Sequence, residues 1–312
     1  MIYFRTFRFG ININTMKLLT IFFFPVVISM IACQSKAEHS EHEVHAGNRV
    51  RKDSPENSDT VVKQKLKDTT FYIKRNSDSI RIDILVPDSE KGVCLLLHGW
   101  NLPSDELCEK TELCKKLLQE GYVLIVPDFG KTTYQWVNYP QTRKDFLKFP
   151  TRSWMQDTFL TRLQVNFNLL NNGGRNFVYG VSTGGRGAAL LALENPKIFR
   201  AAACLSADFD HFALGNEPIN KGYYGSSQQF PERWKGKDNI HNRSSEFKCG
   251  LFLAHGKTDK VCPVSQTENF AQEIQKKNPD LKLKTVIDPY GDHTYLWWNR
   301  QTSAIIEFFN EF

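Results

Sequence analysis

A serine, an aspartate and a histidine, in that order along the chain, each follow an apolar run and could together activate a nucleophile. Ser182 lies in NFVYGVSTGGRGAALLALENP, Asp259 follows GLFLAHGKT, and His293 lies in DPYGDHTYLWW. A serine hydroxyl is a weak nucleophile at neutral pH, so a histidine must take its proton and an acid must orient that histidine. These residue types therefore predict acyl transfer through a covalent acyl-enzyme.

The serine occupies a G-x-S-x-G pattern between a predicted strand and a predicted helix. Gly180 and Gly184 hold the motif positions around Ser182, and the helix-like segment ends at Asn195, just before Pro196. The backbone of a nucleophile at such a turn is strained, and the glycines let the helix pack close to the neighbouring strands. The pattern also occurs by chance, so its weight comes from the acid and the histidine that follow later strands.

Apolar runs that alternate with helical patterns are the elements that must bring these residues together. A hairpin is expected at 71–75 and 79–86, and the near-continuous runs GVCLLLH, YVLIVPD, NFVYGV, AAACLS and GLFLAH follow it. Such runs are typical of parallel strands covered by helices on both faces, whereas the alternating run 281–287 fits an edge strand. The loops after parallel strands gather at one edge of a sheet, where the three distant residues can meet.

Two long stretches have no place in this alternation, about 130–155 and about 208–248. Excursions of this length in a compact fold are commonly lids or pocket walls. The first is rich in aromatic residues, which could stack on sugar rings or acyl chains or could simply pack against the core. Both interpretations stay open on the sequence alone.

Four motifs in this order resemble the α/β-hydrolase family from about residue 69 to the C-terminus. They are the HGW turn with Trp100, the GVSTGG elbow, the HGKTD loop and the terminal GDH. The resemblance implies a mostly parallel sheet of about eight strands with helices on both faces, nearest to the esterase, dienelactone-hydrolase and short prolyl-oligopeptidase-like branches. It also implies an oxyanion hole formed by the main-chain N–H groups of Trp100 and Thr183. Asp208 is the alternative acid, because some members keep theirs after the preceding strand.

The function expected from these residues is a serine hydrolase that cleaves carboxylic esters, with Ser182 as nucleophile, His293 as base and Asp259 as acid. Small-molecule or carbohydrate esters are the expected substrates, with acylated carbohydrate at the cell envelope as one candidate. The alternatives are a prolyl-oligopeptidase-like peptidase, for which no gating domain is expected, and a non-catalytic binding lipoprotein. The triad needs no cofactor and no metal, so none is expected.

The N-terminal segment predicts export. Residues 16–33, MKLLTIFFFPVVISMIAC, place fifteen mostly apolar residues after a lysine, which is short for a membrane span but suits a secretory signal. The stretch resembles a bacterial lipoprotein signal, which implies a signal peptide at 1–32, with the true start possible at Met16, and lipidation of Cys33. A flexible tether over 33–68 and a hydrolase domain over 69–312 would follow. The expected location is extracytoplasmic and lipid-anchored to a bacterial membrane, and the alternative is an uncleaved anchor.

Charge and histidine content exclude two further classes of site. Of the formal net charge of +6, three positive charges fall in the N-terminal segment, and the other basic residues are scattered, so no nucleic-acid partner is expected. His39, His42 and His45 lie in the polar tether without a preorganised partner, so they are expected to be solvated rather than metal-bound.

Six cysteines remain beyond Cys33, and an oxidising compartment would permit disulfides between them. Cys94 and Cys204 lie in strand-like runs and are expected to be buried thiols. Cys108 and Cys114 are expected to share one helix, about 9 Å of rise apart on different faces, and therefore not to form a bond. Pairing of Cys249 with Cys262 stays open.

Overall fold

The carboxyl ends of the parallel strands, where the chemistry is expected, belong to an eight-stranded sheet with the order β1-β2-β4-β3-β5-β6-β7-β8. The computed structural model describes residues 66–75, 78–144, 146, 150–215 and 217–312, which belong to the unit Val62–Phe312. The strands are β1 (Thr69–Arg75), β2 (Asp78–Leu85), β3 (Gly92–Leu97), β4 (Tyr122–Pro127), β5 (Asn176–Val181), β6 (Phe199–Leu205), β7 (Gly250–Gly256) and β8 (Leu283–Asp288).

The sheet follows from the hydrophobic pattern of its strands. β1 and β2 form the expected antiparallel hairpin, and β2 pairs antiparallel with β4, whereas β4, β3, β5, β6, β7 and β8 run parallel. Every residue of β4, β5 and β7 is buried, as expected for strands covered on both faces. β8 is only partly buried and lies at the edge, as its alternating pattern predicts. The predicted fold class is confirmed.

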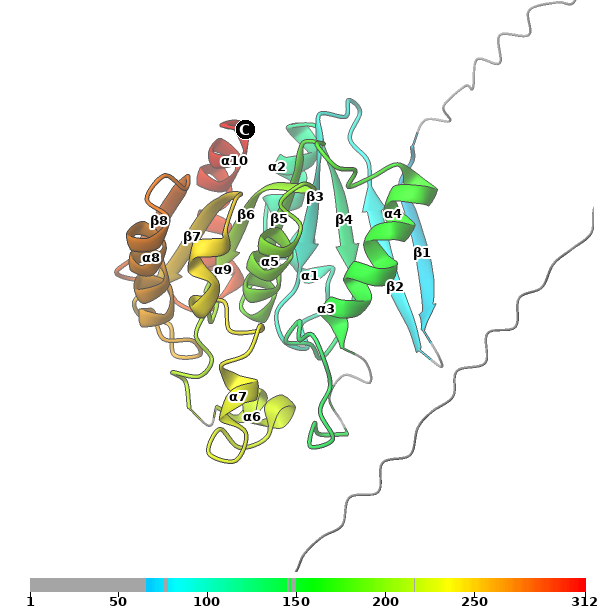
Figure 1. The fold of residues 1–312 in the computed structure, drawn as a ribbon. Coiled ribbons are helices and arrows are strands. Elements are labelled where there is room, and N and C mark those ends of the chain that lie inside the picture. The colour runs from blue at the N-terminus through cyan, green and yellow to red at the C-terminus, as the bar shows by residue number, and fades with distance from the viewer. Residues whose placement is uncertain (1–65, 76–77, 145, 147–149, 216) are drawn as a thin grey trace, which may run out of the picture. The chain divides into compact units, whose positions relative to one another are not determined.

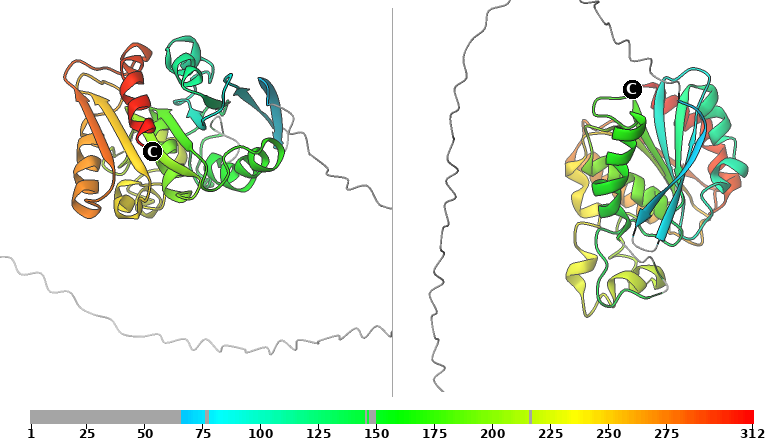
Figure 2. Two further views of the ribbon diagram at one scale, coloured as in Figure 1. Left: turned by 90° about the horizontal axis from the view of Figure 1, so that it is seen from above. Right: turned by 90° about the vertical axis from the view of Figure 1, so that its right-hand side faces the viewer.

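Helices cover both faces of the sheet, and each face has its own hydrophobic core (Figures 1 and 2). Residues of α4, α5 and α8 fill the core on one face, and residues of α1, α2, α9 and α10 fill the core on the other. The helices are α1 (Glu106–Glu109), α2 (Leu113–Gln119), α3 (Thr151–Trp154), the π-helix η1 (Met155–Phe159), α4 (Leu160–Phe167), α5 (Thr183–Glu194), α6 (Pro218–Tyr224), α7 (Pro231–Trp234), the 3₁₀-helix η2 (His241–Glu246), α8 (Ser265–Lys277), α9 (Tyr295–Arg300) and α10 (Thr302–Asn310).

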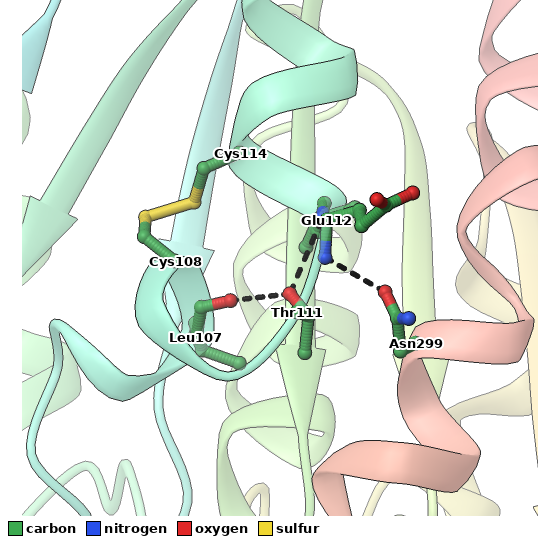
Figure 3. Close-up of a disulfide and its surroundings, with 7 residues drawn as sticks. Leu107, Cys108, Thr111, Glu112, Cys114 and Asn299 are labelled. Carbon is green, nitrogen blue, oxygen red and sulfur yellow. Dashed lines mark hydrogen bonds between the residues drawn. A yellow bond between two sulfur atoms is a disulfide. The ribbon is translucent and has the colours of Figure 1, made fainter.

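One expectation about the cysteines is wrong, because the segment after the HGW turn is not one continuous helix. It breaks between α1 and α2, and the chain turns at Lys110–Glu112 (Figure 3). The turn brings the Cα atoms of Cys108 and Cys114 to 5.1 Å, and the two residues form a disulfide. A rise of 1.5 Å per residue applies only to an unbroken helix, so the estimated separation was too large. Cys249 and Cys262 are both buried free thiols, as are Cys94 and Cys204.

The two excursions pack against each other beyond the carboxyl ends of the strands, near α6 and α7 (Figure 1). Their contact is centred on Arg152, a fully buried side chain that bonds to Asp238 at 2.5 Å and to Glu194 at 3.0 Å. Thr142 donates a hydrogen bond to the carbonyl of Tyr223, which adds a second link between the excursions. Segments joined by contacts 81 and 86 residues apart in the sequence therefore build one substructure beside the sheet edge.

The N-terminal predictions lie outside the described residues. They comprise the signal peptide over 1–32, the start at Met16, lipidation of Cys33, nearly all of the tether and the three tether histidines. Among the residues that the structure does describe, no helix has the length and apolar character needed to span a membrane.

Candidate active site

Ser182 lies at a strained turn between β5 and α5. Its backbone has φ 56° and ψ −128°, a conformation that residues other than glycine rarely adopt. The turn is held by a hydrogen bond of 2.8 Å from the Ser182 N–H to the carbonyl of Leu205 at the end of β6. Backbone strain of this kind costs on the order of 1–3 kcal/mol and clusters at active sites. The turn predicted from the motif is therefore present.

The motif glycines are required because backbone lies against them. A Cβ atom on Gly180 would be 2.1 Å from the carbonyl oxygen of Gly184, and one on Gly184 would be 2.3 Å from that of Leu97. Neither neighbour is a flexible side-chain end, so a substitution would have to move the main chain. The two glycines thus let α5 start directly over β3 and β5, which aims its N-terminus at the strand ends.

The HGW turn passes directly beside the serine. A Cβ atom on Gly99 would lie 3.1 Å from the Cβ of Ser182. His98 is fully buried, and its Nε2 accepts a 2.9 Å hydrogen bond from the N–H of Phe129. The proton of the ring is therefore on Nδ1, which donates to the carbonyl of Gly99 with 2.7 Å between nitrogen and oxygen. The Tyr134 hydroxyl donates to the His98 carbonyl at 2.9 Å. His98 and Tyr134 therefore fix the turn from which an oxyanion donor would come.

The two expected oxyanion donors lie on either side of this serine. Thr183 is the first residue of α5, so its N–H has no acceptor within the helix. The Trp100 N–H makes no hydrogen bond to any residue in the described part of the chain. The ring of Trp100 packs against Phe146 at 4.8 Å and Tyr223 at 6.0 Å, one from each excursion.

Asp259 and His293 are hydrogen-bonded to each other, with 2.7 Å between Asp259 Oδ2 and His293 Nδ1. The other oxygen of Asp259, Oδ1, accepts the N–H groups of Val261 and Cys262, both at 2.8 Å. Burial alone would raise the pKa of Asp259, but hydrogen bonds from His255 and His293 outweigh it and hold this pKa well below its ordinary value. Asp259 therefore stays ionised and can hold His293 with its Nε2 free to face a nucleophile.

A chain of contacts connects His293 with the serine. The His293 ring packs edge-on against Trp298 at 5.2 Å, and the Trp298 indole N–H donates to the Ser206 hydroxyl at 3.0 Å. Ser206 directly follows Leu205, the last residue of β6, and the Leu205 carbonyl accepts the N–H of Ser182. The Ser182 hydroxyl makes no hydrogen bond to a described residue. Catalytic hydrogen bonds are often long in ligand-free structures and tighten in the complex, so this geometry is compatible with a Ser–His pair.

The alternative acid, Asp208, has a different partner. Its carboxylate bonds to Arg186 Nη1 at 2.8 Å, and Arg186 is a fully buried side chain of α5 that also donates to Asn220 at 3.1 Å. Burial raises the pKa of Asp208, and Arg186 offsets this only in part. His293 is thus bonded to Asp259, while Asp208 closes the wall of a neighbouring cavity.

That cavity opens beside Ser182 and has a volume of about 60 Å³. The Arg186–Asp208 pair lines it together with Leu214 and Ile219, both from the second excursion. Pockets for drug-sized ligands measure roughly 300–1,000 Å³, so this cavity suits a small group. No group of three or more His, Cys, Asp or Glu side chains with metal-binding geometry occurs among the described residues.

The fold and the order of these residues can be compared with known proteins. Residues 158–311 match the model of the prolyl oligopeptidase family. This segment contains the elbow, the acid loop and the terminal histidine, and it continues through the helices that follow. The chain has the α/β-hydrolase fold. The family match and the fold together support serine hydrolase chemistry for this α/β-hydrolase.

Solved structures share the fold at low sequence identity. The fluorophosphonate-binding serine hydrolase FphF of Staphylococcus aureus is 18% identical, with a TM-score of 0.60 and coverage of 78% of this chain and 99% of its own. An S-formylglutathione hydrolase of Agrobacterium tumefaciens is 17% identical, with a TM-score of 0.60 and coverage of 78% and 94%. The acylaminoacyl peptidase of Pyrococcus horikoshii is 14% identical, with a TM-score of 0.58 and coverage of 78% and 41%. No curated protein matches the sequence.

Two residues near the site were not predicted from the sequence. Arg186 lies four positions after Ser182 on the same helix, and its pairing with Asp208 depends on a contact across the sheet edge. His255 was interpreted as part of an HG turn, but its Nε2 lies 3.2 Å from Asp259 Oδ2. The signal that could have found His255 is its position four residues before Asp259, at the end of a buried strand.

Proposed function

We propose that this α/β-hydrolase cleaves carboxylic esters, with Ser182 as nucleophile, His293 as general base and Asp259 as the acid that orients it. The observation that carries the proposal is the strained turn at Ser182, next to the first N–H group of α5. The hydrogen-bonded pair Asp259–His293 follows strands that end at the same edge of the sheet. A glycine would adopt φ 56° with less strain than a serine, so packing alone does not explain a serine at this position.

The mechanism follows from this arrangement. As the Ser182 oxygen attacks the ester carbonyl, His293 Nε2 takes the hydroxyl proton, and Asp259 stabilises the resulting imidazolium. The N–H groups of Thr183 and Trp100 hold the negative oxygen of the tetrahedral intermediate. Collapse breaks the bond to the alcohol, which leaves with the proton from His293. Water then attacks the acyl-enzyme as His293 takes its proton, and His293 returns that proton to Ser182 when the carboxylic acid product leaves.

The substrate is proposed to be an ester with a small group at the cavity beside Ser182, such as an acylated carbohydrate or another small ester. A volume of about 60 Å³ between apolar side chains and the Arg186–Asp208 pair supports a short acyl group over a long one. Neighbours of the same fold that are named as a ferulic acid esterase and S-formylglutathione hydrolases also support ester or thioester chemistry.

The alternative is a serine peptidase, and one observation favours it. The matched family model is that of prolyl oligopeptidases, and an acylaminoacyl peptidase shares the fold. The same three residues would serve either reaction, because both pass through an acyl-enzyme. Acyl-nitrophenyl esters tested beside prolyl-peptide anilides would distinguish the two activities.

The proposed location is outside the cytoplasm, with the chain anchored to a bacterial membrane through a lipid on Cys33. The disulfide between Cys108 and Cys114 supports an oxidising compartment, because such bonds are rare in proteins of the cytosol. Incorporation of labelled palmitate, and its loss in Cys33→Ser, would test the anchor. Release of that variant into the soluble fraction should accompany the loss of label.

The test of the proposed function uses a fluorophosphonate probe and the Ser182→Ala variant. Wild-type protein should be labelled and should hydrolyse short acyl-nitrophenyl esters, whereas Ser182→Ala should lose labelling and about 10⁴-fold or more of kcat. Ser226→Ala is the matched control, since this serine lies in the second excursion and its hydroxyl donates to Gln228 rather than lying at the elbow. Labelling that persists in Ser182→Ala, or an absence of labelling in the wild-type protein, would reject the assignment.

A further inference from the structure

A second histidine lies behind the Asp–His pair, on the side of Asp259 away from the solvent. His255 belongs to β7 and is fully buried. Its Nε2 lies 2.9 Å from the carbonyl oxygen of Cys262 and 3.2 Å from Asp259 Oδ2. Its Nδ1 lies 2.8 Å from the hydroxyl of Thr267, which is also fully buried. We propose that His255 is a positioning residue that fixes the Asp259 carboxylate for His293.

The partners of His255 determine which nitrogen carries its proton. A main-chain carbonyl can only accept a hydrogen bond, so the Nε2 of the neutral imidazole must be the donor toward Cys262 and Asp259. Nδ1 is then an acceptor, and the Thr267 hydroxyl donates to it. The Cys262 carbonyl therefore selects this tautomer, and the Thr267 hydroxyl, which can donate or accept, supplies the buried Nδ1 with a partner.

His255 holds the acid by two routes. Its Nε2 lies 3.2 Å from Asp259 Oδ2, and its Nε2–H donates to the carbonyl of Cys262, a residue whose own N–H donates to Asp259 Oδ1. With the N–H of Val261 and the His293 ring, the carboxylate is faced by four donors. A carboxylate fixed at both oxygens cannot rotate away from His293, and residues in such supporting positions keep an active site within its productive geometry.

The inference rests on the proposed function, but it also makes a prediction that needs no turnover. The proton between His293 Nδ1 and Asp259 Oδ2 should give a downfield one-dimensional ¹H NMR signal, assigned by its loss in His293→Gln. In His255→Leu this signal should shift or broaden, because Asp259 loses the donor that fixes it. The conservative variant His255→Gln, whose amide can still donate toward Asp259, should keep the signal closer to that of the wild type.

The kinetic prediction concerns kcat and its pH profile. His255→Leu should lower kcat by about 10–100-fold with little change in KM, the range seen when supporting partners of active-site ligands are removed. Without the His255 donor, more of the negative charge of Asp259 acts on His293 and stabilises its protonated form. The acid limb of the kcat/KM profile should therefore move to higher pH.

Thr267 provides the matched pair of variants if His255→Leu does not fold. Thr267→Val removes the hydroxyl that donates to His255 Nδ1 and should reproduce the NMR and pH shifts to a smaller extent, whereas Thr267→Ser keeps the hydroxyl and should not. A histidine with only a structural role would change the unfolding temperature and leave both readouts in place. An unchanged NMR signal in His255→Leu and Thr267→Val would overturn the inference, whether or not the wild-type protein is labelled by the fluorophosphonate.

Discussion

Removal of the disulfide between Cys108 and Cys114 should destabilise the protein by a calculable amount. The bond joins residues six apart in the sequence, and closing a loop of this size in the unfolded chain corresponds to about 2 kcal/mol at 25 °C. For a unit of this size, such a change lowers the unfolding temperature by about 4–8 °C. The perturbation is the double variant Cys108→Ala/Cys114→Ala, and the assay is urea unfolding at equilibrium.

Reduction of the wild-type protein should have the same effect as the double variant. The other thiols in the described part of the chain are buried, and burial raises the pKa of Cys249 to about 12, which keeps it unreactive. Dithiothreitol should therefore lower the wild-type midpoint to that of the double variant and leave the variant unchanged. Equal midpoints for wild-type and variant protein without reductant, or a variant that still responds to reductant, would refute the reasoning.

The same bond closes the loop that contacts the helix after His293. The N–H of Glu112 donates to the Asn299 side chain of α9 at 2.8 Å (Figure 3). The Lys110 ammonium lies 5.1 Å from the centre of the Tyr295 ring. Since the disulfide acts mainly on the unfolded chain, the folded variant should keep wild-type kcat at low temperature and lose activity sooner on heating. Asn299→Ala removes the contact with α9 and leaves the disulfide intact, so it separates the two effects.

Four further substitutions test the charges around the site. Asp259→Asn should lower kcat by several orders of magnitude, as expected for the wrong histidine tautomer, whereas Asp208→Asn should affect stability more than kcat; the reverse result would move the acid to Asp208. His211 is buried and its pKa is lowered to about 3, first by burial and then by Arg186. Between about pH 6.5 and pH 3 the unfolded chain therefore takes up a proton that the folded protein does not, and stability falls as the pH falls. His211→Phe should therefore be about 2 kcal/mol less sensitive than wild type to a change from pH 7 to pH 5 in urea unfolding. Arg152→Met should cost about 3–5 kcal/mol, because it leaves the buried carboxylate of Asp238 without its ion-pair partner, whereas Glu194 keeps Arg243. An unfolding midpoint equal to that of the wild type would contradict this.

The parts of the site that could be predicted from the sequence are those in which a local pattern reflects a local constraint. The glycines around Ser182 are needed because backbone atoms lie 2.1 and 2.3 Å from where their Cβ atoms would be, and that requirement is visible as a motif. The buried parallel strands are visible as apolar runs, and their order places the ends of β5 and β7 at one edge. The fold and the turn at Ser182 followed from such features.

The parts that could not be predicted depend on contacts between distant segments or on a local break in regularity. The disulfide was missed because the helical pattern around Cys108 and Cys114 continues across a turn that no glycine or proline marks. The pairing of Arg152 with Asp238 joins two stretches with no secondary-structure pattern in common. The role of His255 depends on Thr267, a residue on the next helix that has no distinguishing neighbours in the sequence.

The two excursions have a structural consequence for the proposed oxyanion hole. The first contributes Phe146 and the second Tyr223, and the ring of Trp100 packs between these side chains. The main chain of the HGW turn is held from the other side by His98, which bonds to the N–H of Phe129. The position of the Trp100 N–H therefore depends on contacts from both excursions and from the loop after β4. Among the aromatic residues that the structure describes in the first excursion, Tyr134, Phe146 and Trp154 are buried, which favours packing over the stacking of substrate rings as the role of these three.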